Sequence, residues 1–233
     1  MPDFPRRSRE LRHVWRAPLV LALVLALSNA VSVPGARAAA PAGSYSGQPA
    51  AAVLERLVVK GRAPKTGYAR IRLGQAWNDM DHNGCDTRND ILRRDLSNIR
   101  FRGRCIVETG VLNDPYTGRV ISFRRGVRTS LAVQIDHVVA LSDAWQKGAQ
   151  QLSQFQRDSL ANDPLNLLAV DGPTNEAKGD GDAATWLPPN KPYRCSYVAR
   201  QIEVKAKYGL SVTAAEKAAM GRVLSACPGQ TTP

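Results

Sequence analysis

The stretch Ile135-Asp136-His137-Val138-Val139-Ala140-Leu141 places an Asp-His pair inside a run of apolar, largely β-branched residues. Such a run is typical of a buried strand, and we predict a strand over 133–139 that ends near the pair. A carboxylate supplies a hard oxygen for a divalent cation, and an imidazole is a base that titrates near neutral pH. Each residue alone has a structural explanation: His137 could be a buried core histidine, and Asp136 could be a turn residue. Other polar residues with matching spacing are therefore required before the pair indicates a site.

Two asparagines downstream supply such partners. Asn166 lies in Asp163-Pro164-Leu165-Asn166-Leu167-Leu168, at the start of a second predicted strand, and Asn175 lies where we predict a helix to begin. The order strand, insertion, strand, helix would bring Asp136, His137 and Asn175 into one cleft. Neighbouring strand residues normally point to opposite faces, so Asp136 and His137 share a site only if the strand ends or bends there. Turn chemistry at Asn166 and helix capping at Asn175 are the structural alternatives.

The remaining pattern predicts an α+β, mostly helical single domain over residues 51–230, preceded by a Gly/Pro-rich lead-in at 41–50. Thr87 is a candidate helix N-cap, and Thr213 with Glu216 forms a candidate capping box. The predicted helices are 51–59, 87–96, 142–148, 153–161, 196–208 and 213–224, and a short antiparallel hairpin pairs 105–112 with 119–123.

Residues 1–40 have the pattern of an export signal. Arginines between residues 6 and 16 precede the uncharged stretch 17–36, and small residues follow at Ala36-Arg37-Ala38-Ala39-Ala40. We predict cleavage after Ala38 or Ala40 and a secreted, extracellular protein without stable membrane association after cleavage. An uncleaved anchor is the alternative, but polar and helix-breaking residues interrupt the apolar run.

The charge favours a polyanionic partner. The net charge is +12, and residues 1–40 hold six arginines and two acids, so their removal takes away four positive charges and leaves +8. Nucleic acid is the commonest polyanion, and an anionic cell wall is the alternative.

All four cysteines lie after residue 40, in the part predicted to be exported. An even number of cysteines in an oxidising compartment indicates two disulfides, with three possible pairings. Sequence proximity favours Cys85–Cys105 and Cys195–Cys227. No two cysteines have the close spacing of a four-cysteine zinc site.

The block from Val133 to Gly181 resembles the HNH endonuclease superfamily, with a ββα-metal core at about 131–182. It most resembles the HNH domain at the C-terminus of modification-dependent restriction nucleases and of small secreted actinobacterial proteins. The matching residues are Asp136-His137-Val138-Val139-Ala140-Leu141, Ala144-Trp145, Asn162-Asp163-Pro164-Leu165-Asn166-Leu167, Asn175-x-x-Lys178-Gly179-Asp180 and Trp186-Leu187-Pro188. The similarity extends from about Gly84 to Pro228.

The resemblance implies roles residue by residue. His137 matches the general base, Asp136 the first metal ligand, and Asn166 the asparagine that orients the histidine loop. Asn175 matches the third position, as a second metal ligand where many members have histidine. The resemblance also suggests that Lys178 contacts the substrate phosphate or stabilises transition-state charge. Arg88 is a weaker candidate for phosphate binding, with structural pairing to Asp86 or Asp90 as the alternative. Oxygen ligands favour magnesium, with manganese next and zinc less suited.

The sequence therefore predicts a secreted, monomeric, metal-dependent HNH endonuclease that hydrolyses DNA, with RNA as a second candidate substrate. Sequence specificity is expected to be low, because no helix-turn-helix or zinc finger is evident. The competing hypotheses are a non-catalytic protein that binds polyanions or the cell surface on a nuclease-like core, and a hydrolase of another phosphodiester.

Overall fold

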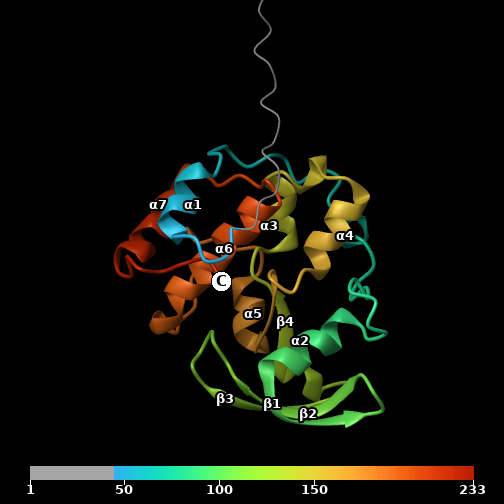
Figure 1. The fold of residues 1–233 in the computed structure, drawn as a ribbon. Helices are drawn as coiled ribbons and strands as arrows, with labels where there is room; N and C mark the ends of the chain where they lie inside the picture. Colours follow the sequence, from blue (N-terminus) through green and yellow to red (C-terminus); the bar gives the residue numbers. More distant parts are fainter. Residues whose placement is uncertain (1–44) are drawn as a thin grey trace, which may run out of the picture. The chain divides into compact units, whose positions relative to one another are not determined.

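The computed structural model describes residues 45–233, so the predicted signal segment lies outside the described residues. At its centre, β4 (Val133–His137) pairs antiparallel with β5 (Leu167–Asp171), and α5 (Gly172–Lys178) follows β5 directly (Figure 1). This confirms the predicted strand–strand–helix order. At the β5–α5 junction, a Cβ on Gly172 would lie 1.9 Å from the Leu131 carbonyl oxygen, so the close approach of the chain requires glycine.

Two helices occupy the insertion between the paired strands. α3 (Leu141–Gln146) and α4 (Gln154–Asn162) lie within two residues of their predicted bounds. α4 begins with a capping box in which Ser153 and Gln156 satisfy each other's backbone N–H groups. The insertion returns the chain to the start of β5 beside the end of β4.

A three-stranded meander lies beyond α2 (Thr87–Asp95). Its last two strands, β2 (Ile106–Asn113) and β3 (Val120–Arg124), confirm the predicted hairpin. The first, β1 (Leu96–Arg102), was not predicted: its side chains are mostly exposed, and apolar and polar residues alternate over only the last four positions. The N-cap of α2 is Asp86 rather than Thr87, since the Asp86 carboxylate accepts a hydrogen bond from the Asn89 backbone.

The C-terminal helices are α6 (Arg194–Lys207) and α7 (Ala214–Ser225), and the predicted Thr213–Glu216 capping box is present. They pack with α1 (Ala50–Arg56) around one apolar cluster, which also contains Leu168 and Val170 of β5. Part of the expected lead-in is bonded to the chain end: the Gly47 N–H donates to the Thr232 carbonyl at 3.0 Å.

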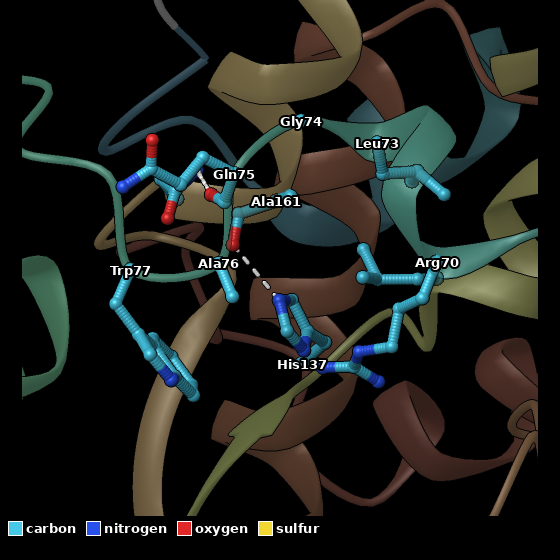
Figure 2. Close-up of a pocket in the computed structure, with 10 residues that line it drawn as sticks. Arg70, Leu73, Gly74, Gln75, Ala76, Trp77, His137 and Ala161 are labelled. Atoms are coloured by element: carbon cyan, nitrogen blue, oxygen red, sulfur yellow. Dashed lines mark hydrogen bonds between the residues drawn. The ribbon is translucent and has the colours of Figure 1, made fainter.

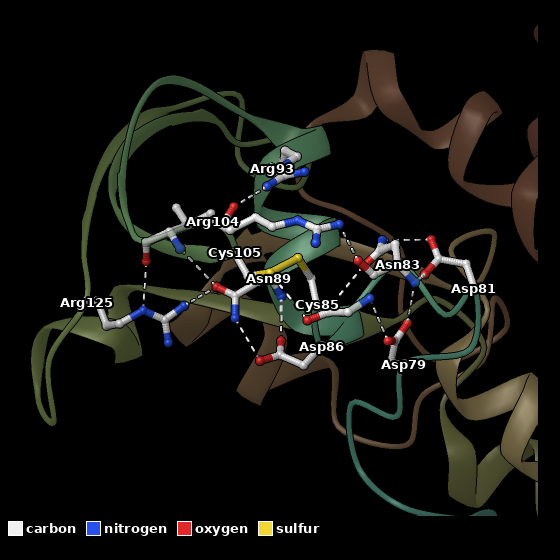
Figure 3. The surroundings of a disulfide bond; sticks show 12 residues. Asp79, Asp81, Asn83, Cys85, Asp86, Asn89, Arg93, Arg104, Cys105 and Arg125 are labelled. Carbon is white, nitrogen blue, oxygen red and sulfur yellow. Dashed lines mark hydrogen bonds between the residues drawn. A yellow bond between two sulfur atoms is a disulfide. The ribbon is translucent and has the colours of Figure 1, made fainter.

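Both predicted disulfides are present. Cys85–Cys105 joins the segment before α2 to the residue before β2, as Figure 3 shows. Cys195–Cys227 ties the start of α6 to the segment after α7. Residues 45–233 thus form an α+β domain with two disulfides, and no helix among them is long and apolar enough to cross a membrane.

The central strand pair separates two apolar clusters. Val133 and Ile135 pack with α2 and the meander, whereas Leu168, paired opposite Asp136, packs with α6 and α7. Because side chains alternate along a strand, His137 faces the α2 side and Asp136 faces the opposite side. This alternation governs the geometry of the candidate site.

Candidate active site

His137 is the last residue of β4, and its side chain is held by the end of α4. Its Nε2 lies 2.8 Å from the backbone oxygen of Ala161. A carbonyl oxygen only accepts hydrogen bonds, so Nε2 carries the proton and donates it. In the neutral ring the other nitrogen, Nδ1, is then unprotonated and is the atom that can act as a base.

A small pocket adjoins the His137 ring (Figure 2). Its volume of about 30 Å³ is room for one or two water molecules. Arg70, Trp77 and Leu141 contribute to its wall. The Trp77 indole stacks on the imidazole at an interplanar angle of 19°, with 6.3 Å between ring centroids. The imidazole thus borders a water-sized space with mainly apolar walls.

Burial keeps His137 neutral. Only 7% of the residue is exposed, and desolvation lowers its pKa to about 4 despite the hydrogen bond to Ala161, which acts in the other direction. The Arg70 charge lowers the pKa further. The ordinary pKa of histidine is about 6.5, near the neutral pH expected from the sequence. His137 is therefore an unprotonated base throughout the physiological pH range.

Asn166 holds the chain that follows His137. It is fully buried, and its Oδ1 accepts a 2.8 Å hydrogen bond from the Val139 N–H. Its Nδ2 donates to the carbonyls of Val139 and Leu160, each at 3.3 Å. The amide therefore connects the loop after β4 to α4, which also supplies the carbonyl that fixes the imidazole.

Asp136 lies on the opposite face of β4, with both carboxylate oxygens occupied. Its Oδ1 is 2.9 Å from the Lys178 ammonium, and its Oδ2 accepts a 2.5 Å hydrogen bond from the Tyr116 hydroxyl. Burial raises the pKa of Tyr116 well above its usual value, with the nearby Asp136 charge adding to the effect. Lys178 also donates to the backbone oxygen of His137 at 2.9 Å. The sequence offered no signal for Tyr116, which reaches Asp136 from the turn before β3.

Asn175 lies within α5 and is not its N-cap, because α5 begins at Gly172 with Asp171 capping it. The Asn175 amide donates to Gln134 Oε1 at 2.8 Å. As arranged, Asp136 and Asn175 do not fit a divalent cation, since an ammonium and a hydroxyl already bind the carboxylate. Within residues 45–233, no three His, Cys, Asp or Glu side chains form a group that could hold a metal ion.

The two cationic candidates for phosphate binding lie in different settings. Lys178 is buried and paired with Asp136, so its ammonium faces the interior. The Arg88 guanidinium lies 5.9 Å from the Trp77 ring centroid, beside the His137 pocket. Arg70, which the sequence reasoning missed because it belongs to no motif and lies far before His137, reaches the same pocket from the turn Arg70–Leu73.

Comparisons with known proteins show the family of the chain. A sequence profile described as "GmrSD restriction endonucleases, C-terminal domain" matches residues 86–223, which is more than half of the chain. A protein of Arthroderma benhamiae, described as an uncharacterized secreted protein, is 37% identical over 210 residues, covering 89% of this chain and 97% of the relative. No solved structure matches the chain. The chain therefore belongs to the family of the C-terminal domain of GmrSD restriction endonucleases, an HNH-like nuclease family.

Proposed function

We propose that the chain is a secreted endonuclease that hydrolyses phosphodiester bonds in DNA, with RNA as a second substrate and with little sequence preference. The observation that carries the proposal is the His137 ring, a neutral imidazole of defined tautomer beside a water-sized pocket. The family supports a nucleic acid substrate, and the net positive charge supports binding to phosphates.

In the proposed reaction, His137 acts as the general base. A water molecule in the pocket gives a proton to Nδ1 as its oxygen attacks phosphorus, and the bond from phosphorus to the leaving alkoxide breaks. The products are a phosphomonoester and a hydroxyl, and the alkoxide takes its proton from solvent. The Ala161 carbonyl, which accepts from Nε2, stabilises the imidazolium while the proton is on the ring. Asn166 is a positioning residue in this scheme, because it holds the loop and touches no reacting atom.

A divalent metal is a further part of the proposal that rests on the family, since HNH nucleases generally use one. Magnesium, with manganese next, stays the ion expected from the resemblance. Asp136 and Asn175 would have to leave Lys178 and Gln134 to bind such an ion. The steps above therefore use no metal at these two residues, and a metal titration is included among the predictions.

Secretion is proposed from three observations. Residues 1–40 have the sequence pattern of a signal peptide, and the Arthroderma benhamiae relative is described as secreted. Two disulfides fit an oxidising compartment. We further propose that residues 51–230 act as one monomeric nuclease domain.

Nicking of supercoiled plasmid by the purified mature protein tests the function. His137→Gln should abolish nicking, and His82→Gln is the matched control because His82 is exposed and does not line the pocket. Full activity in His137→Gln would refute the assigned base. Salt-sensitive DNA binding without cleavage, across several divalent metals, would instead support the non-catalytic binding protein.

A further inference from the structure

Arg70 is a cation without a protein partner at the edge of the His137 pocket. Among residues 45–233, its guanidinium makes no hydrogen bond or ion pair, and the residue is exposed. Figure 2 shows the guanidinium turned toward the imidazole. A structural arginine usually pairs with a carboxylate or a carbonyl, as Arg94 does with Asp95. The free fork of Arg70 therefore points to a ligand from outside the chain.

Arg88 is a second arginine near the pocket; it does not line the pocket itself but lies against Trp77, which does. Its side chain is half-buried and lies over Trp77, and within the described part of the chain it has no hydrogen-bond or ion-pair partner. Burial and the neighbouring Arg125 charge lower the pKa of Arg88, and the nearby Asp86 charge offsets this only in part, so its surroundings disfavour the cation that it carries. A bound anion would offset that cost.

Trp77 lies between Arg88 and the imidazole, whereas Arg70 lines the pocket directly. The indole stacks on His137 and also contacts the Arg88 guanidinium, which places Arg88 no more than about 12 Å from the imidazole centroid. Lys178 could bind a phosphate beside His137 only by leaving its buried pair with Asp136. Arginine is suited to the surface because its planar fork binds two phosphate oxygens at once.

We propose that Arg70 binds the phosphate that is cleaved beside His137, and that Arg88 binds another phosphate of the same strand, one or two nucleotides away. This inference rests on the proposed function and specifies how its substrate is held. Hydrolysis would then depend on Arg70 for any phosphodiester. It would depend on Arg88 only for a substrate that has more than one phosphate.

Two substrates separate the roles. Bis(p-nitrophenyl) phosphate has one phosphate, and a single-stranded DNA oligonucleotide has many. Arg70→Gln should lower kcat/KM roughly 10- to 100-fold on both, as expected for loss of a charge-assisted hydrogen-bonded pair, and Arg70→Lys should restore part of the loss. Arg88→Gln should lower kcat/KM only on the oligonucleotide, mainly through KM.

Arg72→Gln is the matched control. Arg72 belongs to the same short turn, is exposed and does not line the pocket, so both rates should equal those of the wild type. A binding measurement adds a readout that does not depend on turnover. In a His137→Gln background, Arg70→Gln and Arg88→Gln should each reduce the salt slope of binding to the single-stranded oligonucleotide by about 0.7, and Arg72→Gln by less.

The outcomes distinguish this inference from the proposed function. If the wild type cleaves neither substrate, or if His137→Gln stays active, the proposed function fails. If the wild type is active and His137→Gln is not, yet Arg70→Gln matches Arg72→Gln in rate and salt slope, the Arg70 assignment alone is overturned. An equal loss on both substrates in Arg88→Gln would overturn the assignment of Arg88 to a separate phosphate.

Discussion

Replacing Asn166 with alanine tests how the histidine is positioned. The substitution removes the acceptor of the buried Val139 N–H and the donor to two carbonyls. An unsatisfied buried N–H costs about 1–3 kcal/mol, and each of the longer 3.3 Å bonds contributes about 0.5 kcal/mol. We expect the free energy of unfolding to fall by about 3 kcal/mol, within the usual stability of a domain.

Urea denaturation measures this loss. With a slope of about 2 kcal/mol/M, the midpoint should fall by about 1.5 M while the slope itself stays unchanged. Gln150→Ala is the matched control, because it removes a single amide hydrogen bond, to the Trp145 carbonyl at 3.2 Å. Its cost should be near 1 kcal/mol.

Plasmid nicking is then measured at urea concentrations well below the unfolding midpoint, where both variants are folded. Any loss of activity there reflects the position of His137 and not a loss of stability. If Asn166 orients the His137 loop, kcat of the folded Asn166→Ala protein should fall by up to about 100-fold, with KM little changed, because Asn166 touches no substrate. Gln150→Ala should keep its kcat. A large stability loss with a wild-type kcat would refute the positioning argument, and a loss below 1 kcal/mol would refute the hydrogen-bond reasoning.

Three further predictions concern His137, the metal ion and the C-terminal disulfide. Because burial lowers the pKa of His137 to about 4, the base is neutral above that value, so kcat/KM should be level from about pH 6 to 8 and fall as pH drops toward 4; a rise centred near pH 6.5 would contradict this. Lys178→Met leaves the Asp136 charge buried and unpaired and should cost about 3–5 kcal/mol, and Mg²⁺ or Mn²⁺ should raise the Tm of this variant more than that of the wild type; identical responses to metal would count against Asp136 as a ligand. Replacing Cys195 and Cys227 together with serine should lower the free energy of unfolding by about 3–4 kcal/mol, since the disulfide closes a loop with a sequence separation of 32 residues; equal urea midpoints would disprove that contribution.

The candidate site shows where sequence reasoning succeeded and where it stopped. The strand at Asp136-His137 and the second strand near Asn166 follow from short apolar runs, which record burial directly. The direction of the two side chains at Asp136 and His137 did not follow. β4 continues through His137 without a bend in its pairing register, so the two side chains remain on opposite faces.

The sequence also did not predict which charged and polar side chains pair with one another. Lys178 and Asn175 were assigned to substrate and metal by motif position, whereas in the fold their nearest partners are Asp136 and Gln134. Within the described residues, a buried ionic cluster also joins α3, α6 and α7, with Lys147 within 2.8 Å of carboxylates on three separate segments. Its members are Asp143, Lys147, Asp182, Lys205 and Glu216.

Local pattern was sufficient for the order of β4, β5 and α5, the two cysteine pairs and the capping box at Thr213, because each depends on residues in one stretch of the chain, although it missed β1. Packing between distant segments was needed to place Arg70 and Trp77 beside His137 and to place Tyr116 against Asp136. It also set the His137 pKa, since burial depends on what covers a side chain and not on its neighbours in sequence. The sequence pattern was therefore enough to propose His137 as the base. Its tautomer, its charge and the arginines near it are determined by the tertiary structure.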